Sequence, residues 1–162
     1  MLMLTACGDH KEEVENTTEV IEEGTVGFGM MMGGKIEEAA NIPEGERERV
    51  IGAFEEYIAA LNEGDIDRYS ETLSKEPHGF DYEEDIKAVK KIIASQGIQR
   101  QASDVTIVKY SEDEAQVFSN IDTTVQELET GVEQSYSGRQ VTVFAKEEGA
   151  WKVSIVKYMG NE

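Results

Sequence analysis

The stretch Arg139–Met159, RQVTVFAKEEGAWKVSIVKYM, carries the clearest structural pattern in the chain. In the first half, Val141, Val143 and Ala145 occupy every second position, and in the second half Trp151, Val153 and Ile155 do so. This period of two, with many β-branched and aromatic residues, is typical of a half-buried β-strand. Glu147, Glu148 and Gly149 lie between the halves and predict a tight hairpin turn. Because an isolated hairpin is barely stable in water, we expect it to belong to a larger sheet with other elements packed on it.

Two further strands are predicted before this hairpin. Short polar turns separate all four strands, so the sequence favours an antiparallel meander in which neighbours along the chain are neighbours in the sheet. Gly138 is expected to mark a bulge or a bend within the third strand. The four predicted strands are Asp104–Tyr110, Ala115–Leu128, Val132–Lys146 and Ala150–Met159.

A long amphipathic helix is predicted upstream, from Glu46 to about Asn62. Val50, Phe54 and Tyr57 belong to a set of apolar residues at i, i+3, i+4 and i+7 spacing, which places them on one helical face. Gly64 follows the last of these residues and suits the position just after a helix, where the backbone adopts a left-handed conformation.

Two more helices are predicted between the long helix and the sheet. Asp65 suits the cap of a short helix, and Asp81 with Glu84 resembles a capping box that starts a third helix, which Gly97 is expected to end. Asp65 and Asp67 could also be calcium ligands, but the remaining positions of a calcium-binding loop do not match. Capping is therefore the preferred interpretation, and no metal site is expected.

Composition restricts the function classes. The chain has 162 residues, 39% of them hydrophobic, which suits one domain plus a tail. Its net charge is -19, from 15 basic and 34 acidic residues, and no basic stripe is evident in the sequence. Nucleic acid is disfavoured as a partner, because its phosphates would be repelled. No apolar run approaches the ~20 residues that a membrane-spanning helix needs.

The N-terminus contains a sequence similar to a bacterial lipobox. Leu4-Thr5-Ala6-Cys7 has an aliphatic residue and two small residues before the single cysteine, which would receive the lipid. This motif ends an apolar stretch, as a signal peptide requires, although only six residues precede Cys7. The alternative is a free cysteine. We expect residues 1–7 to be a signal-peptide remnant with lipid attachment at Cys7, which places the protein on the extracytoplasmic face of the cell membrane.

Residues 8–45 are predicted to be an acidic tether, because their Gly- and Glu-rich composition offers little apolar surface to bury. Within them, Gly29–Lys35 fits the G-x-x-x-x-G-K spacing of a phosphate-binding loop. Ile36 stands where Ser or Thr should bind magnesium, and no βαβ context surrounds the motif. A nucleotide is therefore not expected, and the sequence indicates no other cofactor.

The remaining residues, 46–162, resemble the nuclear transport factor 2-like superfamily, also called SnoaL-like or ketosteroid-isomerase-like. The resemblance rests on the long helix VIGAFEEYIAALNEGDIDRYSETL, with its break at Leu61–Asp65, and on the closing strand GAWKVSIVKY with Trp151. It implies an α+β fold: a cone-shaped sheet, a four-stranded meander, packed on three N-terminal helices. Members of this superfamily include isomerases, dehydratases and non-enzymatic binding proteins, so the fold alone does not define the function.

The resemblance also implies a pocket between the helices and the concave face of the sheet. The candidate pocket residues are Tyr57, Tyr69, Asp122, Tyr136 and Trp151. Isomerases of the superfamily use an acidic base with a tyrosine-plus-acid oxyanion site, and Asp122 is the best single acid here. Alternatively, Tyr57 and Trp151 belong to the core and Asp122 lies on the solvated face.

Three functions stay open. The preferred one is a non-catalytic, membrane-anchored module that binds a small ligand or an envelope protein. The second is a pocket enzyme of the isomerase or dehydratase type, and the third is an assembly subunit that forms a homodimer through an apolar outer face of the sheet. No residue is assigned a catalytic role; His78, in a predicted loop, has no evident partner for one.

Overall fold

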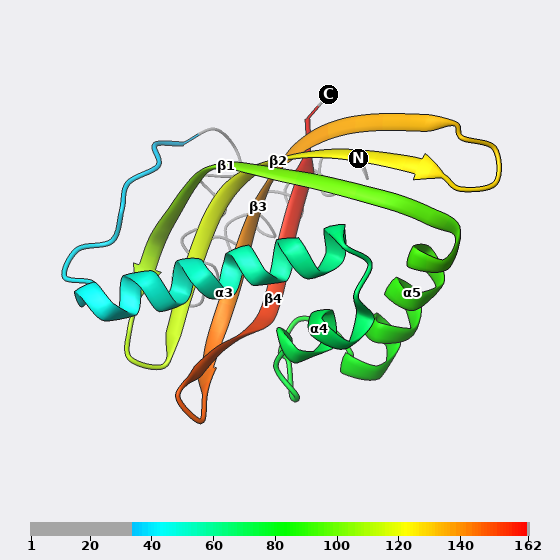
Figure 1. Ribbon diagram of the computed structural model, residues 1–162. Helices are drawn as coiled ribbons and strands as arrows, with labels where there is room; N and C mark the ends of the chain where they lie inside the picture. Colours follow the sequence, from blue (N-terminus) through cyan, green and yellow to red (C-terminus); the bar gives the residue numbers. More distant parts are fainter. Residues whose placement is uncertain (1–33, 162) are drawn as a thin grey trace, which may run out of the picture.

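The computed structural model describes residues 34–161. Within this range, three helices precede a four-stranded antiparallel sheet with strand order β1-β2-β3-β4 (Figure 1). The predicted α+β cone is confirmed. The elements are α3 (Glu44–Asn62), α4 (Ile66–Glu71), α5 (Tyr82–Ser95), β1 (Gln96–Tyr110), β2 (Glu114–Glu127), β3 (Glu133–Glu147) and β4 (Ala150–Gly160).

The lipobox with Cys7, and the tether as far as residue 33, lie outside the described residues, as does most of the Gly29–Lys35 sequence. Residues 34–45, also assigned to the tether, carry three side chains that pack against the domain, Ile36, Ala39 and Ile42. None of the helices in the described part of the chain combines the length and the apolar character needed to cross a membrane.

The helix boundaries follow the predicted caps. The Asp65 side chain accepts a hydrogen bond from the backbone N–H of Arg68 at 3.1 Å, and Asp81 accepts one from Glu84 at 2.9 Å. Both carboxylates satisfy N–H groups that the first helical turn leaves without partners. Gly64 adopts φ 67° just after α3, as expected for the residue that ends a helix.

The start of β1 differs from the prediction. The helix α5 ends at Ser95, and β1 begins directly at Gln96, so Gly97 lies within the strand, paired with Gln126. A register shift between Ser103 and Thr106 divides β1 into two parts. Because this β-bulge interrupts the period-two pattern, the sequence predicts only the second part as a strand.

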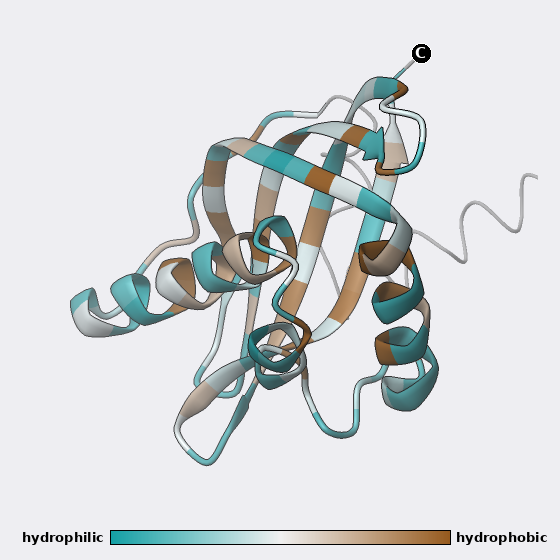
Figure 2. Ribbon diagram, turned by 45° about the vertical axis from the view of Figure 1, so that its right-hand side comes forward, coloured by the Kyte–Doolittle hydropathy of each residue, from teal (hydrophilic) through white to brown (hydrophobic). Residues whose placement is uncertain are grey.

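The closing hairpin is more deeply buried than its alternation predicts. Its turn is formed by Glu148 and Gly149, which have φ 51° and 84°, the left-handed values of a type I′ turn. All residues from Gln140 to Phe144 are buried, on both faces of the sheet. Phe144 lies in the core that packs on the helices, and Val141 belongs to a second cluster. Figure 2 shows hydrophobic residues alternating with more hydrophilic ones along the strands.

The two clusters lie on opposite faces of the sheet. The concave face packs against α3, whose Val50, Phe54 and Tyr57 are buried. The convex cluster contains Val108, Phe118, Val141 and Val143, with Ile36 and Ile155 packed against it. Helix α3 therefore covers one part of the concave face, and the part beyond the C-terminal end of α3 stays open.

Gly138 does not form a bulge in the pairing of β2 with β3, which is regular throughout. It instead allows the Tyr158 ring of the neighbouring strand to lie directly over the β3 backbone. A Cβ atom at Gly138 would lie 2.3 Å from the Tyr158 ring and 2.7 Å from the Met159 carbonyl oxygen.

We therefore expect Gly138→Ala to lower the free energy of unfolding by about 1–3 kcal/mol, because Tyr158 and the β4 backbone must move. Gly52→Ala, on an open face of α3, is the control and should raise it by about 0.5–1 kcal/mol. Urea unfolding followed by circular dichroism measures both. Equal stability of Gly138→Ala and the wild type would contradict this role for Gly138.

Candidate functional site

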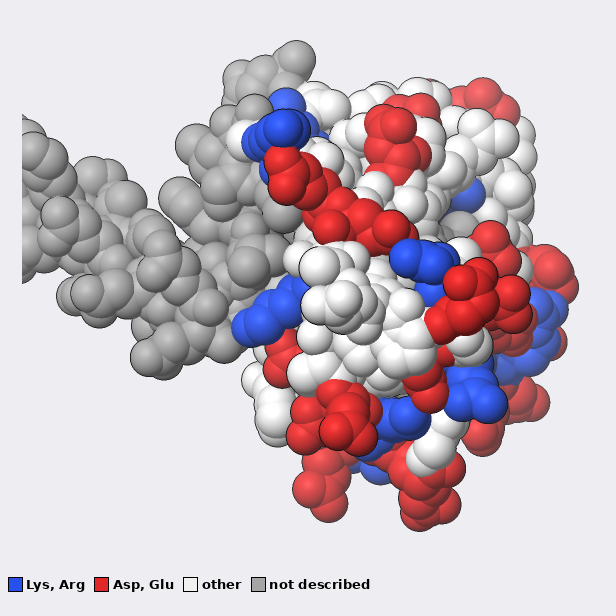
Figure 3. All heavy atoms as spheres, turned by 90° about the vertical axis from the view of Figure 1, so that its left-hand side faces the viewer, with Lys and Arg blue, Asp and Glu red and all other residues white. Residues whose placement is uncertain are grey.

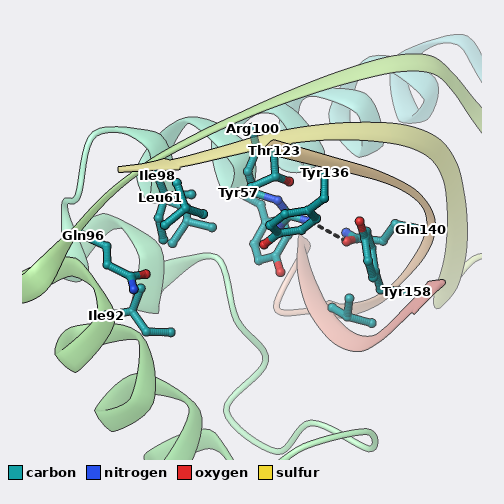
Figure 4. A pocket seen from close by; sticks show the side chains of 12 residues that line it. Tyr57, Leu61, Ile92, Gln96, Ile98, Arg100, Thr123, Tyr136, Gln140 and Tyr158 are labelled. Atoms are coloured by element: carbon teal, nitrogen blue, oxygen red, sulfur yellow. Dashed lines mark hydrogen bonds between the residues drawn. The ribbon is translucent and has the colours of Figure 1, made fainter. Parts of the chain in front are cut away.

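A cavity of about 340 Å³, called here the cone pocket, lies between the concave face of the sheet and the ends of α3 and α5 (Figure 4). All four strands and both helices contribute to it. Its lining residues are Tyr57, Leu61, Ile92, Gln96, Ile98, Arg100, Thr123, Val125, Tyr136, Gln140, Val156 and Tyr158.

Strand alternation selects these side chains. On β1, Ile98 and Arg100 face the pocket, and on β2, Thr123 and Val125 do so. Successive side chains of a strand point to opposite faces, so Asp122 points away from the pocket. Asp122 is exposed on the convex face, where it accepts a hydrogen bond from the Ser137 hydroxyl at 2.6 Å.

Arg100 is held in place by two neighbours. Its backbone N–H and C=O pair with the amide side chain of Asn62 at 2.7 and 2.9 Å. Its Nη2 atom donates to Oε1 of Gln140 at 2.8 Å, and the Gln140 amide donates in turn to the Thr142 hydroxyl at 2.9 Å. Gln140 and Thr142 are fully buried, so the guanidinium is anchored to a rigid part of the sheet.

The Thr123 hydroxyl has no hydrogen-bond partner. Thr123 is 3% exposed, and its oxygen and that of Ser119 are the two unpaired buried side-chain atoms among residues 34–161. A buried hydroxyl without a partner loses its hydration without compensation, so the pocket carries an unfilled hydrogen-bonding position. Figure 4 shows Arg100, Thr123, Tyr57 and Tyr136 grouped together.

A second cavity, of about 250 Å³, lies next to the cone pocket and shares Tyr57 with it. We call it the tyrosine hollow; its lining residues are Tyr57, Tyr69, Leu73, Gly79, Phe80, Asp85, Val153 and Val156. The Tyr57 and Tyr69 rings stack with centroids 5.8 Å apart, and the Tyr69 hydroxyl donates to Asp85 at 2.7 Å.

Burial governs the titration of these groups. It raises the pKa of Asp85, although the hydrogen bond from Tyr69 opposes the increase. Burial also raises the pKa of the Tyr57 hydroxyl, against the attraction of the Arg100 cation. The pKa of Tyr69 is raised, again mainly by burial and then by the negative charges that Tyr57 and Asp85 can carry. Both tyrosines are therefore neutral hydrogen-bonding groups at neutral pH.

The predicted pocket residues are divided among several places. Tyr57 lines both cavities, Tyr69 lines the tyrosine hollow, and Tyr136 lies at the edge of the cone pocket with 51% of its surface exposed. Asp122 lines neither cavity. Trp151 is 4% exposed and belongs to the core.

The contacts of Trp151 hold the fold together and do not belong to either cavity. Its indole N–H donates to Oε1 of Glu46 at 2.9 Å, and Lys146 lies 5.2 Å from its ring. Lys146 also donates to Oε2 of Glu46 at 3.1 Å. The hydrogen bonds from Trp151 and Lys146 hold the pKa of Glu46 below its usual value. Together these contacts tie the closing hairpin to the start of α3.

The sequence did not predict several polar residues of the two cavities, among them Arg100, Thr123, Gln140 and Asp85. Arg100 precedes the predicted start of its strand, although Ile98, Arg100 and Ala102 already alternate with polar residues. Thr123 and Gln140 have ordinary strand positions. Asp85 appears in the sequence as one of several acids in a helical first turn, and no local pattern connects it with Tyr69.

Comparison with solved structures confirms the nuclear transport factor 2-like fold. A ketosteroid isomerase-like protein from Erwinia carotovora atroseptica has a TM-score of 0.62 and 19% identity, with coverage of 74% of this chain and 99% of that one. A candidate dehydratase of the nuclear transport factor 2-like family from Streptomyces avermitilis has a TM-score of 0.65, 16% identity and coverages of 74% and 99%.

A nuclear transport factor 2-like superfamily protein from Salmonella enterica serovar Typhimurium has a TM-score of 0.64 and 13% identity, with coverages of 72% and 91%. At such identities the likeness concerns the fold, which fits a ligand-binding cone domain. No curated protein matches the sequence. Residues 53–158 match the family described as the C-terminal domain of anti-sigma-I factor RsgI9, and the chain therefore belongs to this family.

Proposed function

We propose that this protein is an extracytoplasmic lipoprotein, anchored to the membrane through Cys7, whose cone domain binds a small ligand without converting it. The observation that carries the binding role is the cone pocket, with apolar and aromatic walls, one fixed cation and one unfilled hydrogen-bonding position. Ligand sites in proteins typically combine an apolar lining with a few placed polar groups.

The chemistry of the lining supports binding without conversion. The residues that line the cone pocket include no Asp, Glu, His, Cys or Lys, so that tyrosines are the main groups there that could transfer a proton. The matching family is named for the C-terminal domain of an anti-sigma-I factor. A tether would let a ligand-binding domain work at a distance from the membrane.

Val125→Phe tests the pocket, because the larger side chain fills it from β2. Gln126→Phe is the matched control, since the next residue of the strand points to the opposite face. We expect small aromatic fragments to bind the purified full chain in ligand-observed NMR, and Val125→Phe to reduce that binding at least ~10-fold, while Gln126→Phe preserves it. Fragments that fail to bind the wild type, or that bind Val125→Phe equally well, would refute the binding role.

The anchor has its own test. We expect mass spectrometry of the membrane fraction to find a mature N-terminus at a lipidated Cys7, and Cys7→Ser to move the protein out of that fraction. Ala6→Gly, which keeps a small residue before the cysteine, should still be processed. Any mature N-terminus other than lipidated Cys7 would end this part of the proposal.

An enzyme of the isomerase or dehydratase type is the second candidate, and Asp85 is the observation that favours it. A carboxyl group whose pKa is raised by burial and that accepts a hydrogen bond from a tyrosine is a recurrent feature of acid–base sites. Asp85 lines the tyrosine hollow, which shares Tyr57 with the cone pocket. A substrate extending from one cavity into the other would bring this carboxyl group within reach.

Asp85→Asn tests whether this carboxylate opposes folding. A raised folded-state pKa means that the protonated group favours folding below the unfolded value of 3.8, and that this contribution is lost as the pH rises through the folded value. We therefore expect Asp85→Asn to raise the melting temperature at pH 7 and to lose that advantage near pH 3. A lower melting temperature at pH 7 would assign Asp85 a structural role and remove the support for an enzyme.

A further inference from the structure

Arg100 differs from other arginines of the domain. Arg47, Arg49 and Arg68 each form an ion pair with a glutamate on the surface. Among residues 34–161, no ion pair of Arg100 is found, although the chain contains 34 acids. The positive charge of this half-buried cation is not balanced by its main partner, a neutral amide. An anion would therefore gain more Coulomb energy beside Arg100 than beside an arginine at the surface.

The guanidinium has donors left for such an anion. It carries five N–H groups in a planar fork, and its hydrogen bonds with Gln140 and Tyr57 leave several of them available. Asn62 fixes the backbone of Arg100 and Gln140 fixes its side chain, so the fork is preorganised and a ligand does not have to order it. A planar group with two acceptor oxygens matches this geometry best.

Thr123 supplies the second, independent observation. Its buried hydroxyl lacks a partner and lines the same pocket as Arg100. Hydroxyl and guanidinium can both donate, so what the pocket lacks is an acceptor. A carboxylate provides acceptors for both groups at once, whereas a ligand cation or an aliphatic group provides none.

The other residues of the cone pocket indicate which chemical group the rest of the ligand carries. Leu61, Ile98 and Val125 form apolar walls, and the rings of Tyr136 and Tyr158 stand at the mouth with 51% and 39% of their surfaces exposed. Exposed tyrosines beside an apolar cavity gain by stacking on a flat ring. A volume of about 340 Å³ accommodates a ligand with one or two rings and excludes a folded peptide.

We infer that the cone pocket binds a small aromatic carboxylate, with its carboxylate on Arg100 and Thr123 and its ring between the apolar walls and the two tyrosines. This inference rests on the proposed binding function and adds the chemical class of the ligand.

The acidic character of the chain is compatible with this ligand. Acidic side chains are distributed over the face shown in Figure 3, with basic ones among them. Their repulsion falls off within about 8–10 Å at physiological salt, so a single carboxylate responds mainly to the cation beside it. A polyanion or an anionic membrane surface would instead meet the whole acidic surface and be repelled.

The test compares matched acids and amides. Benzoate and trans-cinnamate are titrated into the purified full chain by NMR or calorimetry, and benzamide and cinnamamide serve as neutral isosteres. We expect the acids to bind at least ~10-fold more tightly than the amides, because a hydrogen-bonded charge adds that much to a neutral contact.

Three variants locate the contact. Arg100→Gln should weaken binding of the acids about 10- to 100-fold and leave the amides within about twofold. Thr123→Val keeps the side-chain shape, removes the unpaired hydroxyl and should weaken the acids by about fivefold without loss of stability. Arg49→Gln, at an exposed arginine, is the matched control and should change nothing.

Each outcome separates this inference from the proposed function. If acids and amides bind equally and Arg100→Gln has no effect, the pocket binds ligands but the carboxylate assignment is refuted. If none of the four compounds binds the wild type, the carboxylate assignment is refuted, and the fragment experiment with Val125→Phe decides separately whether the pocket binds ligands. Should Arg100→Gln not fold, unchanged affinity of the acids for Thr123→Val would by itself refute the assignment.

Discussion

The packing of α3 across the concave face of the sheet is the interaction on which the rest of the domain depends. Val50, Phe54 and Tyr57 bury one side of the helix against side chains of the sheet, including Phe144 and Val153. Burial of this kind is the main favourable contribution to folding. Without the helix, the concave face would expose its apolar residues and the domain would lose the larger of its two hydrophobic clusters.

The same packing creates the pocket. The helix α3 ends at Asn62, before the sheet does, and the Asn62 side chain pairs with the backbone of Arg100 at the point where the helix stops covering the sheet. Beyond that point the concave face continues without a helix over it, and α5 forms the opposite wall. Core and pocket are thus successive parts of one surface, one filled by α3 and the other left for a ligand.

Some polar groups of this surface have hydrogen-bond partners and others do not. Gln140 and Thr142 are buried and hydrogen-bonded, whereas the buried hydroxyl of Thr123 has no partner. Asp85 is half-buried and carries a raised pKa. Thr123 and Asp85 each line one of the two cavities, which is the placement expected where side chains serve binding or chemistry, whereas the unpaired Ser119 hydroxyl lines neither cavity.

The sequence by itself determined the fold class, the helix caps at Asp65 and Asp81, and the closing hairpin, because these depend on periodicity and on contacts between residues a few positions apart. It did not determine the site. Arg100 meets Gln140 across 40 residues, and Tyr69 meets Asp85 on a different helix. The bulge in β1 breaks the alternating pattern, so the sequence does not predict the part of the strand that carries Arg100. The register of β2 decides that Asp122 lies on the convex face of the sheet. Only the tertiary structure decided which side chains share a cavity, because register, sheet curvature and the end of α3 bring together residues that no local pattern connects.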